Sequence, residues 1–139
     1  MRNLILTLAI IFLGGVIHAQ EKNGVTVTVF IENVLSDQGN VLAALHTEET
    51  FMRGGGIADY STKAQAGELS FQFDNVTPGV YAISVMQDKN ENFRMDMETN
   101  GMPVEPYGFS GNDMAMGPPV FDNSKFEVEY QDLEIRIRF

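Results

Sequence analysis

Residues 69–86 read LSFQFDNVTPGVYAISVM, and this stretch carries the clearest structural signal of the 139-residue chain. Over residues 69–74, apolar and polar side chains alternate, which is the period of a strand with one buried face. Residues 75–79 predict a turn, because Pro precedes Gly as a type II turn prefers. The almost wholly apolar run at residues 80–86 predicts a central strand. The stretch therefore predicts two consecutive strands joined by a tight turn.

Strand-like patterns recur on both sides of this stretch. Helical periodicity is nearly absent, and residues 52–67 show the least pattern of any kind. Further strands are predicted at residues 25–31, 41–46, 126–130 and 133–139. Short strands separated by turn signals are typical of a sandwich or barrel. We therefore expect an all-β fold, an immunoglobulin- or transthyretin-like β-sandwich of about seven strands with a long ordered loop.

The first 19 residues have the layout of a secretory signal peptide. Arg2 supplies a positive charge, residues 4–17 are almost wholly apolar, and Ala19 is a small residue at the cleavage position. A membrane anchor is the alternative, but the apolar stretch is shorter than the ~20 residues of a spanning helix. We expect residues 1–19 to be removed and residues 20–139 to form one exported domain, periplasmic or secreted, without a membrane span.

The amino-acid composition excludes some classes of binding partner and some kinds of chemistry. The chain has 9 Lys+Arg against 19 Asp+Glu, a formal charge of −10, which argues against binding to nucleic acid. Loss of Arg2 with the signal peptide changes this charge to −11. The chain has no Cys, which excludes disulfides, thiolate metal sites and thiol catalysis.

The densest polar segment spans residues 87–100 and has oxygen-bearing side chains at alternate positions. Ca²⁺ takes six to eight oxygen ligands, which such a loop can provide. It is not an EF-hand, because Phe93 and Thr99 stand where Gly and Glu are required. One interpretation is a calcium loop with these ligands, the carbonyl of Arg94 included: Asp88, Asn90, Asn92, Arg94, Asp96 and Glu98. The missing Gly favours the other interpretation, a metal-free turn in which Asn and Asp side chains bind backbone groups, and Lys89 and Arg94 neutralise the carboxylates.

A second segment, residues 101–121, is rich in Gly, Pro, Met and aromatic residues. One interpretation is a binding surface for an envelope protein or a glycan, with Tyr107, Phe109 and Ser110 as contacts. The burial of apolar side chains favours the other, an ordered loop in which Tyr107, Phe109 and Phe121 fill one end of the core.

Signals for catalysis are weak. Residues 108–112 resemble a nucleophile elbow around Ser110, but Asn112 replaces the required Gly. After signal cleavage His46 is the only histidine, and it ends an apolar run, where a structural role is the commoner one. We expect a non-catalytic protein; a small hydrolase built on Ser110 and His46 is the alternative.

Three segments together carry a family resemblance: residues 73–92, residues 101–110 (GMPVEPYGFS) and residues 119–123 (PVFDN). The chain resembles the DUF2141 family of exported bacterial proteins over roughly residues 24–139. The Pro-Gly-x-Tyr piece is shared more widely, with transthyretin-like and carboxypeptidase-regulatory-like sandwiches. The resemblance implies a β-sandwich, and the family has no established activity.

The family's polar loop commonly reads His-Asp-x-Asn-x-Asn-Gly-x-x-Asp. The acidic and amide positions match here, but Gln87 replaces His and Phe93 replaces Gly. We therefore expect an exported, non-catalytic binding or accessory domain of the cell envelope with an unknown ligand. A purely structural envelope domain is a further alternative.

Overall fold

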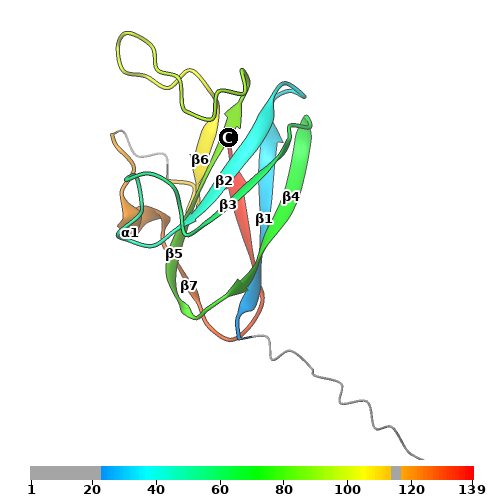
Figure 1. Ribbon diagram of the computed structural model, residues 1–139, viewed down its shortest axis with the longest axis vertical. Helices are drawn as coiled ribbons and strands as arrows, with labels where there is room; N and C mark the ends of the chain where they lie inside the picture. Colours follow the sequence, from blue (N-terminus) through cyan, green and yellow to red (C-terminus); the bar gives the residue numbers. More distant parts are fainter. Residues whose placement is uncertain (1–22, 114–116) are drawn as a thin grey trace, which may run out of the picture.

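The computed structural model describes residues 23–113 and 117–139, and it is an all-β sandwich (Figure 1). The predicted signal peptide, residues 1–19, lies outside the described residues. Two sheets pack face to face, with eight strands and one short helix in the described part of the chain. The predicted fold class is confirmed, with eight strands in place of about seven. Within the same residues, no helix is long and apolar enough to cross a membrane.

The smaller sheet has three strands in the order β4-β1-β8, with β1 antiparallel to β4 and parallel to β8. Its strands are β1 (Val25–Val34), β4 (Gly67–Val76) and β8 (Leu133–Arg138). The larger sheet has the order β3-β2-β5-β6, and β7 pairs with the first residues of β5. Its strands are β2 (Asn40–His46), β3 (Ala58–Lys63), β5 (Gly79–Asp88), β6 (Tyr107–Phe109) and β7 (Phe126–Val128); the helix α1 is Phe121–Ser124.

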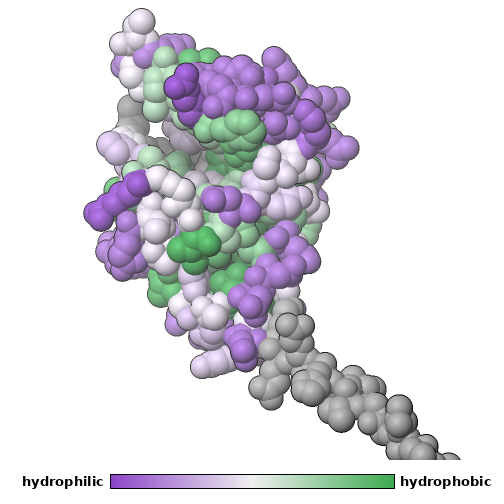
Figure 2. Space-filling model, in the orientation of Figure 1, coloured by the Kyte–Doolittle hydropathy of each residue, from purple (hydrophilic) through white to green (hydrophobic). Residues whose placement is uncertain are grey.

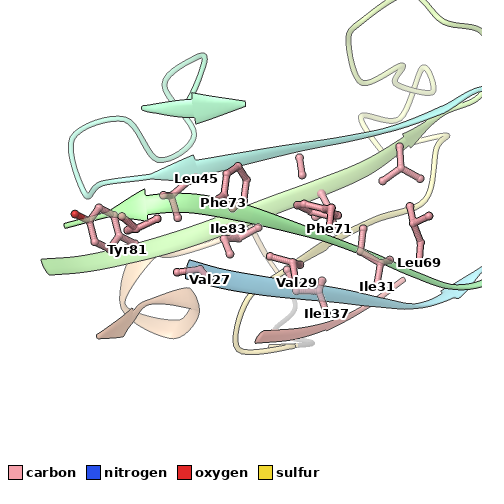
Figure 3. Close-up of a cluster of buried hydrophobic side chains, with 14 of the residues drawn as sticks. Val27, Val29, Ile31, Leu45, Leu69, Phe71, Phe73, Tyr81, Ile83 and Ile137 are labelled. Atoms are coloured by element: carbon pink, nitrogen blue, oxygen red, sulfur yellow. The ribbon is translucent and has the colours of Figure 1, made fainter. Parts of the chain in front are cut away.

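The core lies between the two sheets and follows the alternation in the sequence. Val27, Val29 and Ile31 of β1 are fully buried, as is Ile83 of the central strand β5 (Figure 3). Each such side chain contributes about 1.5–3 kcal/mol by leaving water. The last residue, Phe139, also packs against this core.

The predicted type II turn between β4 and β5 is wrong. Such a turn needs a left-handed glycine, but Gly79 is not in that conformation and is the first residue of β5. The reason is topological, because β4 and β5 belong to different sheets and the chain crosses between them without forming a hairpin. The crossing is fixed by the hydroxyl of Tyr81, which donates to the carbonyl of Thr77 at 2.8 Å.

We call each side of the sandwich, where the outer strands of the two sheets approach each other, a seam. The seam at which β6 contacts β8 is closed. A Cβ on Gly108 would lie 2.6 Å from the carbonyl oxygen of Arg138, so only glycine allows this approach. The side chain of Asn112 then acts as a substitute strand partner for β8. It donates to the carbonyl of Arg136 at 2.8 Å and accepts from the N–H of Arg138 at 2.8 Å. These bonds cover the outer edge of β8.

Candidate functional site

The long loop between β5 and β6 begins at a buried carboxylate. Asp88 is the last residue of β5 and is 0% exposed. Its Oδ1 accepts from the backbone N–H of Asn92 at 3.2 Å, and its Oδ2 accepts from that of Phe93 at 2.8 Å. One side chain thus folds the following five residues into a tight turn, as Asx side chains do.

A second buried carboxylate, Glu105, holds the same loop from its other end. Its Oε1 accepts from the N–H of Lys89 at 2.9 Å, and its Oε2 accepts from the N–H of Asp96 at 3.3 Å. Sequence analysis did not single out this residue. Glu105 lies inside the GMPVEPYGFS segment, but that segment alone does not predict that the carboxylate is buried.

Most of the predicted calcium ligands lie together, but their oxygens face N–H groups. The side-chain amide of Asn90 donates to Asp96 at 2.6 Å, and that of Asn92 donates to the same carboxylate at 2.9 and 3.0 Å. The N–H of Arg94 donates to Oδ1 of Asn92 at 3.1 Å. Glu98 lies farther out in the loop, where its N–H donates to the carbonyl of Met102 at 2.8 Å.

This arrangement is a hydrogen-bonded network, and Ca²⁺ would require it to change. Within the described residues, no three or more His, Asp or Glu side chains are grouped to hold a metal. A cation at Asp96 would need Asn90 and Asn92 to turn their oxygens toward it, because both amides now present nitrogen. The donor set in its present orientation does not fit Ca²⁺, so calcium binding stays a prediction.

The backbone of the loop turns where a glycine would be expected. Glu91 and Phe93 have φ angles of 58° and 60°, in the left-handed region that favours glycine. Phe93 occupies the position that Gly holds in the family pattern, and its backbone adopts the conformation that Gly would adopt. The bond from its N–H to Asp88 helps offset the cost of about 1–2 kcal/mol for that conformation.

The loop projects from one end of the sandwich (Figure 1), and it exposes apolar side chains. Five large apolar residues between β5 and the start of β6 are exposed, and we call them the apolar loop surface: Phe93, Met97, Met102, Val104 and Tyr107. At this end of the molecule, Figure 2 shows apolar side chains interleaved with hydrophilic ones.

The three predicted partner contacts have different environments. Tyr107 is exposed, so it does not fill the core. Phe109 is half-buried and packs edge-on against Phe51 at 5.6 Å between ring centroids. Ser110 is 1% exposed, and its assignment to a surface is wrong. Its hydroxyl donates to the carbonyl of Ser124 and accepts from the N–H of Ile83, which draws the side chain inward.

The histidine lies in a buried polar cluster apart from Ser110. Nε2 of His46 is 2.9 Å from Oγ of Ser84, and Nδ1 is 3.3 Å from Oγ1 of Thr50. The ring also meets the edge of Phe51. Burial lowers the pKa of His46, which favours the neutral ring. Because the hydroxyl of Ser110 bonds elsewhere, the Ser110–His46 pair that a hydrolase would use is not formed.

The chain belongs to the DUF2141 family, which is described as uncharacterized proteins conserved in bacteria; the family model matches residues 29–136. Comparison with curated proteins and with solved structures gave no match. The family match agrees with the sequence resemblance and assigns no function.

Proposed function

We propose that this domain is an exported, non-catalytic binding module of the bacterial cell envelope and that the apolar loop surface contacts its partner. One observation supports this most directly: exposed apolar side chains are gathered on a loop whose backbone is fixed by two buried carboxylates, Asp88 and Glu105. Export is inferred from the signal-like residues 1–19.

The concentration of exposed apolar area favours a binding role. Single exposed apolar residues are normal on a protein surface, whereas grouped ones indicate an interaction site. Of the eleven large apolar side chains that are exposed in the described part of the chain, five belong to the apolar loop surface. Because the loop backbone is already ordered, binding loses less conformational entropy than it would with a flexible loop.

The chemistry of the loop favours a protein over a glycan as the partner. Aromatic residues and methionine are enriched in protein–protein interfaces, and four of the five residues of this surface are of these types: Phe93, Met97, Met102 and Tyr107. Glu98 and Arg94 are exposed on the same loop, and Glu91 is already paired with Lys63 at 2.6 Å, so the loop carries charges of both signs. The expected partner surface is therefore apolar at its centre and polar at its rim.

A glycine substitution tests this proposal without disturbing the loop backbone. Phe93 is 72% exposed and already left-handed, so Phe93→Gly removes the ring and keeps the turn. The purified mature domain is incubated with envelope extract, cross-linked and analysed by mass spectrometry. A protein captured by the wild type should be lost with Phe93→Gly.

A matched control replaces an exposed aromatic residue outside the loop. Tyr130 is 87% exposed, and Tyr130→Ser should capture the same protein as the wild type. Two results would contradict a role for the apolar loop surface. In one, Phe93→Gly captures the protein as well as the wild type does; in the other, Phe93→Gly and Tyr130→Ser both lose it. Unchanged melting temperatures of both variants would show that the effect is not unfolding.

A further inference from the structure

The second seam of the sandwich, between β3 and β4, is open. These are outer strands of the two sheets; in the described residues β3 pairs with β2 and β4 pairs with β1. They approach each other where Tyr60 stacks on Phe71, with ring centroids 4.3 Å apart, and diverge toward the other end of the sandwich (Figure 1). A groove of about 430 Å³ lies in the diverging region.

The groove has an apolar floor and two acidic rims. Leu45, Phe73 and Val76 are buried beneath it, and Ile57 is 54% exposed at one end. Figure 2 shows apolar side chains between hydrophilic ones in the lower half of this face, the region into which the two strands diverge. Among the described residues, the lining contains no Lys, Arg or His.

The two rims carry Asp59 on β3 and Asp74 on β4. Within residues 23–113 and 117–139, the carboxylate of Asp59 makes no hydrogen bond and no ion pair, although its charge acts on His46 and partly offsets the lowering of the pKa of that ring by burial. Asp74 accepts from the hydroxyl of Thr26 at 3.1 Å and from the side chain of Gln72 at 3.2 Å, which orient its carboxylate without neutralising it. Two negative charges therefore flank an apolar groove.

The outer edge of β3 adds backbone groups to this site. An unpaired edge can accept an extended segment as an additional strand, whose alternate side chains point to opposite faces. The seam between β6 and β8 cannot accept an additional strand, because Asn112 covers the edge of β8 and Gly108 allows β6 to lie against β8. The fold closes one seam and leaves the other available.

We propose that the groove between β3 and β4 binds an extended segment of a partner protein in which apolar residues alternate with Lys or Arg. The apolar side chains enter the groove, and the cationic side chains meet Asp59 and Asp74. Charge complementarity favours this occupant over a second copy of the chain, because the chain carries a formal charge of −10 and would repel itself.

The test uses a fluorescently labelled eight-residue peptide of alternating Lys and Val, with a Glu–Val peptide of equal length as the ligand control. Anisotropy should show binding of the Lys–Val peptide and none of the Glu–Val peptide. The double variant Asp59→Asn/Asp74→Asn should bind about tenfold more weakly, from the loss of two ion pairs. Ile57→Ser should also weaken binding, through the apolar contact.

A control variant with the same change in charge separates the groove from general electrostatics. Glu127 and Glu129 are exposed outside the groove, and Glu127→Gln/Glu129→Gln should bind the peptide as the wild type does. Equal binding by the two double variants would overturn the proposal, as would amide shifts in NMR spectra confined to residues 89–107. A dimer in ultracentrifugation that the peptide does not dissociate would assign the groove to a second copy. Phe93→Gly should leave peptide binding unchanged, so this result is independent of the apolar loop surface.

Discussion

The buried carboxylate of Asp88 should hold the loop between β5 and β6, and Asp88→Asn measures how strongly. The wild-type side chain accepts two backbone hydrogen bonds at 3.2 and 2.8 Å while fully buried. A hydrogen bond to a charged group contributes about 1.5–3 kcal/mol. The asparagine keeps one oxygen but turns an amide N–H₂ toward the second donor, so one bond is lost and the other loses its charge. We expect the free energy of unfolding to fall by about 3 kcal/mol.

Two measurements test this value, one global and one local. For a domain of this length, about 3 kcal/mol corresponds to a decrease of ~12 °C in Tm. Hydrogen exchange followed by NMR should show loss of protection at the amides of Asn92 and Phe93, the two donors. Trypsin should cut after Lys89 or Arg94 faster in the variant than in the wild type, because the loop opens more often.

The matched control is Glu98→Gln, which removes an exposed carboxylate from the same loop. It should change Tm by less than about 2 °C, in line with other exposed substitutions. The reasoning would be refuted if Asp88→Asn melted within the same interval and its Asn92 and Phe93 amides stayed protected. In that case the loop would be ordered by contacts other than the buried carboxylate.

Four further predictions concern the core, the histidine, the closed seam and the metal. Ile83→Ala, at a fully buried position of β5, should lower the free energy of unfolding by about 2–5 kcal/mol in urea titrations. Burial lowers the pKa of His46, so as the pH falls below ~6.5 the unfolded chain binds a proton before the folded chain does. The free energy of unfolding should therefore decrease as the pH falls through this range. His46→Gln should show a flatter dependence of stability on pH between about pH 5 and 8. Asn112→Ala should cost about 1–3 kcal/mol and increase aggregation seen by light scattering, because two backbone groups of β8 lose their partner. If the loop binds Ca²⁺, millimolar Ca²⁺ should raise the Tm of the wild type above its value in EDTA, and should not raise the Tm of Asp96→Asn. Equal melting curves of the wild type in Ca²⁺ and in EDTA would exclude the site.

The strands that the sequence predicted are those with a buried face made of large apolar residues. The alternation at residues 25–31 and at residues 69–73 became β1 and β4, because each alternate side chain enters the core. β3 was missed, since residues 58–63 are mostly polar and the strand lies at a sheet edge with no fully buried residue. β6 was missed because three residues carry no detectable period and depend on pairing with β5.

The site was predictable in position but not in its contacts. Residues 88–98 were singled out as either a calcium loop or a metal-free turn, because Asp and Asn stand at alternate positions, and the side chains of Asp88 and Asn92 do make the hydrogen bonds of a turn. Glu105 could not be found this way, because its bonds to Lys89 and Asp96 join residues 16 and 9 positions apart. Ser110 was expected at a partner surface because it lies in the segment rich in Gly, Pro, Met and aromatic residues, and its burial depends on partners that the fold brings to it.

The two carboxylates couple the order of the loop to the sandwich itself. Asp88 ends β5 and Glu105 lies two residues before β6, so both are positioned by strands that pair with each other. In a chain without cysteine, these hydrogen bonds hold the two ends of the loop, because no disulfide can. Asp88 is fully buried and cannot contact a partner. Asp88→Asn should nevertheless weaken partner binding, because it disorders the loop, and it should also lower the free energy of unfolding. Phe93→Gly should weaken the same binding with stability retained, and this difference separates a residue that positions the apolar loop surface from one that touches the partner.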